Sequence, residues 1–410
     1  MPNIRRSTYV FFYFQDGSFI DIRVLLKGLA ELTRVKQIYA ISVLCREVYP
    51  ITMEDLLVLH EIPSDEWIPL SRIIEKYPKL GSQAIKHFAH RGLILSDEDD
   101  SKLAELRQQH EKLASSQWNI FAAFYHFMTK WEDMHLRIKL PDDSETLGEI
   151  NTENFNVMEK FVELYGKPPT HFHSEPNRLS THELPIIKRD HPLYKLLLQR
   201  RTTRAYDRSQ PMTLEQLAII LYYVYGCHGY SRIFEDIIGL KRTSPSGGGL
   251  HPVGVYTLVI NVDGLEAGLY HYSMQNHSLE MIELLERKEA EDLANEFTSG
   301  QSFPKQAHVL FIMTARFYRN FWKYRKHPKA YTVINMDAAH LSQTLYLVCA
   351  ELGLGAFVTA AINSINIERR LGLNGFDEGA IVICGCGIPL SGVSNPDPEF
   401  LPYIPRLTAL

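Results

Sequence analysis

The run RRTTRAYD at residues 200–207 is followed along the chain by SPSGGGLHP at 244–252 and ELGLG at 351–355. Arg200, Arg201 and Arg204 offer guanidinium groups that bind phosphate through paired hydrogen bonds, and Thr202 and Thr203 add hydroxyl donors. The triple glycine lets backbone approach a flat ligand with no Cβ in the way. Together, the three stretches predict a cradle for a phosphorylated, planar cofactor.

Each stretch by itself has a simpler explanation. An arginine cluster is more often a solvated helix end than a ligand site, and a flexible turn would also explain three glycines. The chain has no G-x-G-x-x-G between a strand and a helix and no Gly-Lys-Ser/Thr of a P-loop. We therefore disfavour a dinucleotide-fold dehydrogenase, and the few cations suit the single phosphate of FMN better than FAD.

Composition agrees with a globular enzyme. The chain has 410 residues, 45% hydrophobic and 22% charged, enough for two or three domains with substantial cores. Its net charge of -5 gives a nucleic-acid partner no electrostatic support. The five cysteines form no C-x-x-C pair, which argues against a zinc ribbon and a disulfide framework. Because no run resembles a signal peptide or a membrane span, we expect a cytoplasmic protein, and we expect no metal site.

The first hundred residues follow the element order of a winged helix. Apolar residues 9–14 predict a strand that enters a hairpin at Gln15-Asp16-Gly17. Thr52 can cap a helix, and two more short helices are expected at 72–77 and 82–92. A strand at 93–95 and an acidic turn at 97–100 complete the order.

This region has three alternative roles. Its third helix carries a modest positive strip, but DNA binding would need more Lys and Arg, and the turn that follows is acidic. Holding a peptide and purely structural packing, such as dimer contacts, both remain open.

We predict three parts: a winged-helix-like peptide-binding region at 1–100, a helical connector and linker at 101–190, and a cofactor domain at 191–410. The connector contains aromatic side chains at helical spacing, which indicate core. His126 lies among them and is predicted to be a satisfied core histidine. Residues 168–190, rich in Pro, His and Ser, are typical of a linker.

The last part predicts an α+β fold with helices around one sheet. Thr213 and Gln216 form a capping box for a helix whose expected buried face is Leu214, Leu217, Leu221 and Val224. β-branched and aromatic residues predict strands at 253–262 and 268–273. Continuous apolar runs predict buried strands at 308–315 and 380–386, and a helix with an apolar stripe precedes the ELGLG stretch.

Six pieces in this order resemble the nitroreductase-type FMN fold, in the branch of the SagB-type azoline dehydrogenases that mature ribosomally made peptides. They span about residues 192–407 and are RRTTRAYD, SPSGGGLHPVGVY, GLYHYS, ARFYRNFWKY, DAAHLSQTLYLVCAELGLG and AIVICGCGIP. The resemblance implies an FMN domain behind a winged-helix-like region that holds substrate peptide. It also implies a homodimer, because in this fold the flavin lies between subunits and each contributes to the site.

The resemblance also implies cofactor-binding residues. Arg200 and Thr202 are expected at the FMN phosphate, and Arg204 beside flavin N1 and O2, where a cation stabilises the anionic reduced flavin. Ser244, Ser246 and Gly247 are expected along the isoalloxazine edge. The pair Ala360-Ala361 stands where related enzymes have Glu-Gly, whose backbone N–H faces flavin N5, and Arg406 stands where a late cation closes the phosphate site.

Lys323-Tyr324 matches a Lys-Tyr pair of the same branch and is the predicted catalytic pair. Oxidising a thiazoline or oxazoline to an azole removes a hydride from one ring carbon and a proton from its neighbour. Lys323 could take that proton and Tyr324 could orient or relay it. The alternative is that Lys323 belongs to an exposed basic run that guides an acidic peptide.

The sequence therefore predicts an FMN-dependent azoline dehydrogenase acting on a precursor peptide, with a cyclodehydratase as a candidate partner and with no nucleic-acid or membrane partner. One rival keeps the flavin but reduces a dehydroamino acid or small electrophile with NAD(P)H. Another is a catalytically silent scaffold that binds peptide.

Overall fold

The computed structural model describes residues 1–20, 32–78, 81–135, 137–139, 145–147, 159, 162–163, 165–172, 174–187 and 189–390. The chain divides into two compact units. Unit 1 comprises Met1–Lys130, Arg316–Val333 and Asn374–Glu378, and unit 2 comprises Trp131–Ala315, Ile334–Leu373 and Gly379–Leu410. This grouping differs from the predicted division at residues 100 and 190, which stays a prediction.

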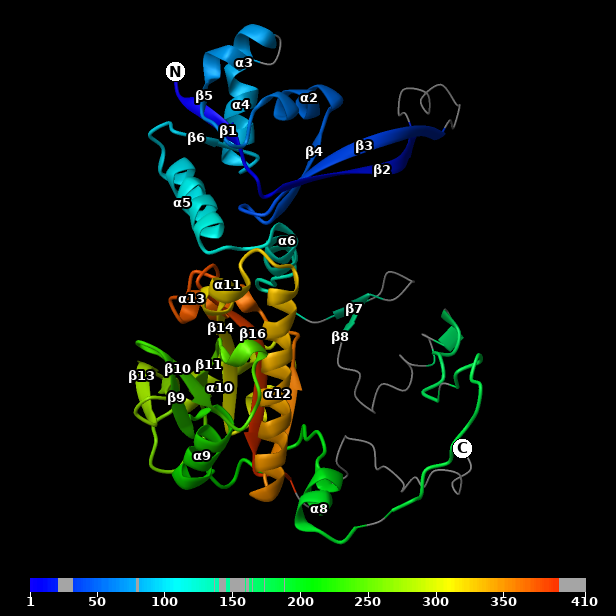
Figure 1. The fold of residues 1–410 in the computed structure, drawn as a ribbon, viewed down its shortest axis with the longest axis vertical. Helices are drawn as coiled ribbons and strands as arrows, with labels where there is room; N and C mark the ends of the chain where they lie inside the picture. Colours follow the sequence, from blue (N-terminus) through cyan, green and yellow to red (C-terminus); the bar gives the residue numbers. More distant parts are fainter. Residues whose placement is uncertain are drawn as a thin grey trace. The chain divides into compact units, whose positions relative to one another are not determined.

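A small sheet and three helices form the start of unit 1 (Figure 1). The sheet has the strand order β5-β1-β6, with bounds Ile68–Pro69, Asn3–Arg6 and Ile94–Ser96. The helices are α2 (Met53–Glu61), α3 (Leu70–Lys76) and α4 (Gly81–His90). The predicted cap of α2 is confirmed, because the Thr52 hydroxyl accepts from the Asp55 N–H and the Asp55 carboxylate accepts from the Thr52 N–H. The order of three helices followed by a strand is therefore as expected.

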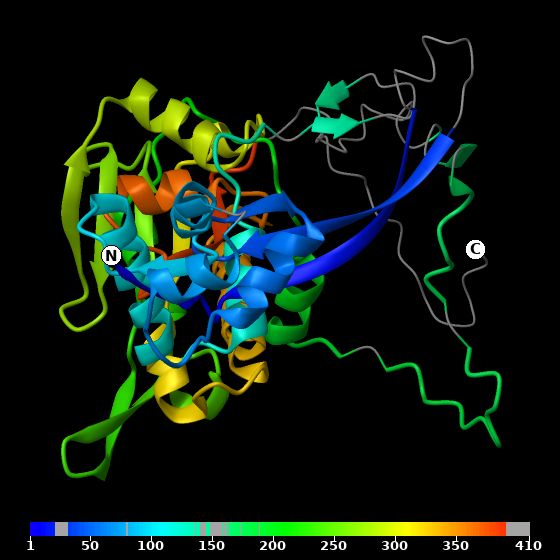
Figure 2. The same cartoon turned by 90° about the horizontal axis from the view of Figure 1, so that it is seen from above.

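A three-stranded sheet, β2-β3-β4, also belongs to unit 1. Strands β2 (Val10–Ile20) and β3 (Leu32–Ser42) pair antiparallel over their whole length, and β4 (Glu47–Ile51) pairs with the end of β3. Figures 1 and 2 both show β2 and β3 side by side as long blue arrows. The turn predicted at Gln15-Asp16-Gly17 is wrong, since these residues stay in strand β2 and pair with Gln37, Lys36 and Val35. Cross-strand pairing outweighs the local turn preference there.

Aromatic side chains fill the core between α5 (Ser101–Ser115), α6 (Ile120–Met128) and α11 (Phe317–Tyr324). The ring centroid of the buried Trp118 lies 4.7 Å from that of Phe317 and 4.8 Å from that of Phe321. His126 is buried, with Nδ1 3.0 Å from the Tyr331 hydroxyl and Nε2 3.2 Å from the Gly375 carbonyl oxygen. Burial, aided by the charge of Lys130, holds the pKa of His126 well below its usual value. The prediction of a satisfied core histidine is confirmed.

The helical expectation for the connector is only partly right. Helices α5 and α6 lie where helix was expected, but β7 (Arg137–Lys139) and β8 (Glu145–Leu147) form an antiparallel pair of strands in the same stretch. Isolated three-residue strands have too little periodicity to be distinguished from helix in a sequence.

Unit 2 is built on a six-stranded sheet with the order β13-β12-β11-β14-β16-β15. The strands are β11 (Val253–Val259), β12 (Gly268–Ser273), β13 (Ser278–Leu284), β14 (Val309–Arg316), β15 (Gly355–Thr359) and β16 (Glu378–Gly387). A separate hairpin pairs β9 (Gly229–Phe234) with β10 (Ile237–Lys241). The helices are α8 (Pro192–Gln199), α9 (Leu214–Ile220), α10 (Arg287–Phe297), α12 (Lys329–Glu351) and α13 (Ser364–Arg370). Figure 1 shows α12, in orange, running alongside the strands. The predicted α+β fold is confirmed.

The core of unit 2 follows the predicted strand pattern. β14 is buried at every position but its last, and side chains of β11, β14 and β16 pack with Phe297 of α10 and Phe357 of β15. The capping box of Thr213 and Gln216 at the start of α9 is confirmed. Leu217 of α9 is buried, as are Leu221 and Val224 in the π-helical turn Leu221–Tyr225 that continues the helix. Leu214 is 45% exposed, so its predicted place on the buried face is wrong. Leu214 is the first residue of the helix, where the chain has only just reached the core.

None of the helices in the described part of the chain is long and apolar enough to cross a membrane.

Candidate functional site

The arginine-rich segment 200–207 is fixed against strand β15. The Thr203 N–H donates to the Ala356 carbonyl over 2.9 Å, and Thr202 forms a parallel bridge to Ala356. A Cβ at Gly355 would lie 2.5 Å from Thr203 Cγ2, so only glycine allows this approach. Helix α8 ends at Gln199, so the segment is an ordered extension of the sheet and not a solvated helix end. Two of the three stretches singled out in the sequence, RRTTRAYD and ELGLG, therefore meet.

Tyr346 of α12 contacts Arg200 and Thr202, the residues predicted to bind the FMN phosphate. The Arg200 guanidinium carbon lies 5.4 Å from the Tyr346 ring centroid, and the Thr202 hydroxyl lies 3.2 Å from the Tyr346 hydroxyl. Burial raises the pKa of Tyr346, while the Thr202 hydrogen bond and the charges of Arg200 and Arg204 oppose that rise. Arg204 itself stands with its guanidinium carbon 5.6 Å from the Phe303 ring centroid. Two cations and a hydroxyl are thus held within one small region, as an anionic group requires.

The glycine-rich stretch forms a tight turn on the other side of α12. Gly247–Gly249 is a 3-10 turn in which Gly248 and Gly249 have φ of 66° and 68°, a conformation that favours glycine. Ser246 Oγ donates to Asp337 Oδ2 over 2.6 Å, and the Gly247 N–H donates to Asp337 Oδ1 over 3.0 Å. The Ser244 and Thr344 hydroxyls are 2.6 Å apart. Helix α12 therefore sets the shape of the predicted flavin-edge loop.

Asp337 is the residue that sequence reasoning missed. It is 3% exposed and holds the loop through two hydrogen bonds from residues about ninety positions earlier in the chain. A signal was present, because Asp337 stands four residues before Leu341 in the apolar stripe of the helix, and a carboxylate at a buried helical position needs partners. Tyr346 lies outside that stripe and carried no such signal.

The two groups face opposite sides of α12. Asp337 and Thr344 are seven residues apart and share a face, whereas Tyr346 is nine residues from Asp337, about half a turn away at about 100° per residue. Arg200 and Thr202 contact the Tyr346 side, and Ser244, Ser246 and Gly247 lie on the Asp337 side. A single chain therefore does not bring all the predicted FMN-binding residues to one face of the helix.

The remaining predicted residues are placed as follows. Ala360 and Ala361 follow β15, and the Ala361 N–H donates to Thr359 Oγ1 over 3.2 Å. Gln301 Nε2 donates to the Ala361 carbonyl over 3.0 Å. The Ala361 N–H is thus hydrogen-bonded within its own chain, whereas the implied role would have a backbone N–H of this pair directed at flavin N5. Arg406 lies outside the residues that the structure describes.

Lys323 and Tyr324 lie at the end of α11, in unit 1, whereas the residues around Tyr346 and Asp337 belong to unit 2. Lys323 is exposed, with Nζ 5.6 Å from the ring centroid of the half-buried Tyr324. Tyr324 is seven residues after Phe317 and so lies on the face of α11 that buries Phe317, Asn320 and Phe321, whereas Lys323 lies off that face. Cations are close together in this segment, since burial and then the charge of Arg316 lower the pKa of Arg319. Lys323 therefore projects from a firmly packed helix, and Tyr324 stands at the edge of its buried face.

Replacing Asp337 by alanine is expected to lower the free energy of unfolding by about 2–4 kcal/mol, because a half-buried hydroxyl and a half-buried N–H lose their shared acceptor. Denaturant unfolding followed by circular dichroism measures this. Ser342→Ala, on the same helix with its hydroxyl bonded only to the Ala339 carbonyl, is the matched control and should change stability by less than about 0.5 kcal/mol. Equal stabilities of the two variants would contradict the anchoring role of Asp337.

The sequence profile described as "Nitroreductase family" matches residues 197–388. A protein of Methanocaldococcus jannaschii named as a nitroreductase is 31% identical over 189 residues, which cover 46% of this chain and 88% of that protein. The trifolitoxin-processing protein TfxB of Rhizobium leguminosarum bv. trifolii is 27% identical over 221 residues, covering 52% of this chain and 58% of that protein. Among solved structures, the E. coli microcin synthetase McbBCD complex has a chain that is 16% identical, with 71% of this chain and 98% of that chain covered and a TM-score of 0.46.

The match to the archaeal protein spans most of that protein, and the nitroreductase profile covers all the predicted cofactor-binding residues except Arg406. The chain spans little more than half of the trifolitoxin-processing protein, so the activity of that whole protein does not transfer by similarity alone. The six sequence pieces, the profile and the archaeal relative agree on one assignment. The chain belongs to the nitroreductase family of flavin-binding oxidoreductases.

Proposed function

We propose that this protein is an FMN-dependent dehydrogenase that oxidises thiazolines or oxazolines in a ribosomally made peptide to azoles. The observation that carries the proposal is the cluster of Arg200, Thr202 and Arg204 around Tyr346. The similarity to a protein named for trifolitoxin processing supports a peptide as the substrate class. The precursor peptide is thus the proposed partner, with a cyclodehydratase as a second.

The residues present fit a phosphorylated flavin. Two guanidinium groups and a hydroxyl make a donor set that suits a phosphate. We place the phosphate at Arg200 and Thr202, and Arg204 beside N1 and O2 of the ring. We place Ser244, Ser246 and Gly247 at the ring edge, where a Cβ at Gly249 would meet nothing of its own chain within 4 Å. Arg406 is proposed to add a late cation at the phosphate.

We further propose a homodimer in which each flavin is bound by two chains. The arginine cluster and the glycine-rich turn lie on opposite faces of α12, so one flavin reaches both kinds of residue only if a second copy supplies one of them. In a two-fold dimer, each chain then contributes its arginine cluster at Tyr346 to one flavin site and its glycine-rich turn at Asp337 to the other.

A mixing experiment tests this arrangement. Arg200→Ala with Arg204→Ala removes one half-site. Gly249→Asn adds a side chain at the other, because its own chain leaves room for a Cβ there and asparagine tolerates the positive φ of this position better than larger residues do. Each variant alone should lack flavin. When both are co-expressed with different tags, about one quarter of the wild-type flavin content should return, because half of the dimers are mixed and each mixed dimer holds one intact site. Absence of any recovery in isolated mixed dimers would contradict the shared site.

The proposed reaction removes two hydrogens from the azoline ring. Bound FMN would supply the two-electron acceptor for the hydride, and oxygen would be the final oxidant. Lys323 takes the proton from the neighbouring ring carbon, and the Tyr324 hydroxyl orients the ring or relays that proton. Arg204 would stabilise the negative charge of the reduced flavin. A carbon–carbon double bond between these two ring carbons completes the aromatic azole.

Anaerobic mixing of the purified protein with a thiazoline-containing peptide tests the chemistry. Loss of oxidised-flavin absorbance, together with a peptide product lighter by two hydrogens, is the expected result. Flavin reduction by NAD(P)H alone, followed by a heavier peptide product, would instead show a reductase. A protein that purifies without flavin would show a silent scaffold.

A further inference from the structure

The hairpin of β9 and β10 leaves large apolar side chains exposed. Its strands pair with each other and with no other strand of the described chain. Tyr230, Ile233 and Phe234 are 76%, 70% and 63% exposed. A two-stranded hairpin is only marginally stable in water unless it packs against another element, and an exposed apolar patch marks an interaction surface. Within the described residues, the hairpin therefore lacks the element that would cover it.

Helix α8 lacks a covering element in the same way. None of its eight residues is buried, and Leu198 is 87% exposed. At about 100° per residue, its four exposed apolar side chains lie within about 140° of one another around the helix axis and are Leu193, Tyr194, Leu197 and Leu198. So short a helix is not stable in water by itself and depends on packing of its apolar face. Figure 1 shows α8 and the hairpin at separate places in the chain, so neither covers the other within one copy.

Each of these two elements adjoins one half of the proposed flavin site. Helix α8 ends at Gln199, directly before Arg200 of the arginine cluster. Strand β10 ends at Lys241, three residues before Ser244, where the glycine-rich stretch begins. In the proposed dimer, the arginine cluster of one chain meets the glycine-rich turn of the other. Helix α8 of the first chain is thereby brought to the hairpin of the second.

The base of the hairpin is fixed beside the glycine-rich stretch. The His228 N–H donates to the Lys241 carbonyl over 2.8 Å, which closes the two strands at their base. The Thr243 hydroxyl donates to the Tyr223 carbonyl over 2.6 Å, which ties the end of the hairpin to the π-helical turn after α9. The direction of the hairpin is therefore set by the same segment that carries the predicted flavin-edge residues.

The charges beside the two apolar surfaces are complementary. The hairpin turn consists of Glu235 and Asp236, both exposed. Exposed arginines flank α8, since Arg189 lies with its guanidinium carbon 5.5 Å from the Tyr194 ring centroid and Arg201 follows the end of the helix. Opposite charges of this kind select a partner and its orientation more than they add affinity. A second copy of the chain thus offers both the apolar and the charged complement.

We infer that the β9–β10 hairpin packs against α8 of a second copy of this chain, with Phe234 at the tip of the hairpin on the leucine side of the helix. This contact rests on the proposed homodimer and adds to it the surfaces that join the two copies. Burial of apolar side chains supplies the affinity, and the acidic turn faces the arginines beside α8. Because α8 continues directly into Arg200, the hairpin of one copy fixes the position of the phosphate-binding cluster of the other.

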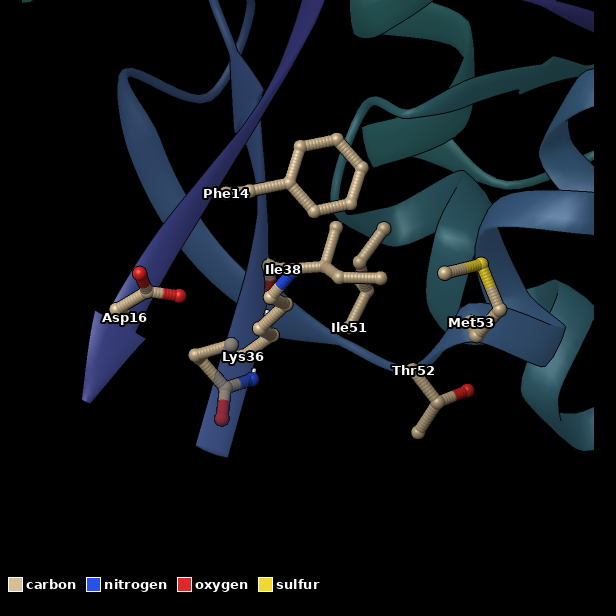
Figure 3. A pocket seen from close by; sticks show the side chains of 8 residues that line it. Phe14, Asp16, Lys36, Ile38, Ile51, Thr52 and Met53 are labelled. Carbon is tan, nitrogen blue, oxygen red and sulfur yellow. Dashed lines mark hydrogen bonds between the residues drawn. The ribbon is translucent and has the colours of Figure 1, made fainter. Parts of the chain in front are cut away.

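Cross-linking between two different copies tests the contact. Copies of the 410-residue chain carrying Leu198→Cys or Phe234→Cys are co-expressed with different tags, and mixed dimers isolated by both tags are treated with a short bismaleimide. A covalent product that joins the two differently tagged chains is expected. Phe14→Cys replaces Phe234→Cys in the matched control, because Phe14 is a similarly exposed phenylalanine, at 60%, in a groove of unit 1 (Figure 3). Wild-type chains set the background from the half-buried Cys45 and Cys227.

The strength of the dimer gives a second measurement. Phe234→Asp should raise the dimer dissociation constant by about tenfold or more, since it places a charge in an apolar contact, whereas Phe14→Asp should change that constant by less than about twofold. Analytical ultracentrifugation over a dilution series measures both. Equal dissociation constants for the two variants, a cross-link yield no higher than that of the Phe14→Cys control, or failure to recover mixed dimers would each overturn the inference.

The same preparations separate this contact from the proposed function. Mixed dimers that hold flavin but do not cross-link would refute the contact and leave the shared flavin site standing. Cross-linked dimers that hold flavin but do not oxidise a thiazoline-containing peptide would refute the proposed chemistry and leave the contact standing.

Discussion

Replacing Arg200 and Arg204 together by alanine is expected to leave the purified protein without flavin. Each charge-assisted hydrogen bond contributes about 1.5–3 kcal/mol, so losing two weakens FMN binding by about 10²- to 10⁴-fold. Isothermal titration calorimetry of the apoprotein with FMN measures the loss of affinity. The visible absorbance of the purified protein measures the loss of bound flavin. The effect should be large because the two guanidinium groups supply most of the positive charge around Tyr346.

Arg208→Ala is the matched control for this double variant. Its guanidinium belongs to the same stretch of chain but pairs with Glu291, so its removal should leave FMN affinity within about threefold of wild type. Full flavin content in the double variant, with affinity equal to that of Arg208→Ala, would show that the phosphate is bound elsewhere.

Lys323→Ala and Tyr324→Phe are expected to retain FMN but to slow substrate-driven flavin reduction by about 10²- to 10⁴-fold, the usual contribution of a positioned proton-transfer group. Stopped-flow absorbance under anaerobic conditions measures the rate. Lys323 is exposed, and Tyr324→Phe removes only the hydroxyl of a half-buried ring, so neither change should disturb packing. Unfolding midpoints should therefore stay near that of wild type.

Lys323→Arg separates proton transfer from electrostatic guidance. Arginine keeps the charge but does not release a proton near neutral pH, so it should be as slow as alanine if Lys323 is the base. Lys326→Arg, an exposed position on the same basic segment, is the control and should react at the wild-type rate. If Lys323→Arg reduces flavin as fast as wild type, Lys323 guides the peptide, and Tyr324 becomes the next candidate for the base.

Local signals in the sequence were sufficient for the helices and for much of the sheet. The capping boxes at Thr52 and Thr213 depend on side chains within one turn of the helices that they begin, and both helices start as predicted. The continuous apolar run of β14 implied burial on both faces, and the strand is buried. Gln15-Asp16-Gly17 failed as a turn signal because its pairing partners on β3 lie about twenty residues away, beyond the reach of a local preference.

By itself the sequence determined the α+β fold, the family resemblance and the residue types that suit a flavin phosphate, since these depend on periodicity and on motifs of a few adjacent residues. Only the tertiary structure decided where those residues meet. It joined segment 200–207 to β15 through a glycine that admits Thr203, and it tied the glycine-rich turn to Asp337. It also placed the two groups on opposite faces of α12, because the 3.6-residue turn of a helix separates positions 337 and 346 by half a rotation.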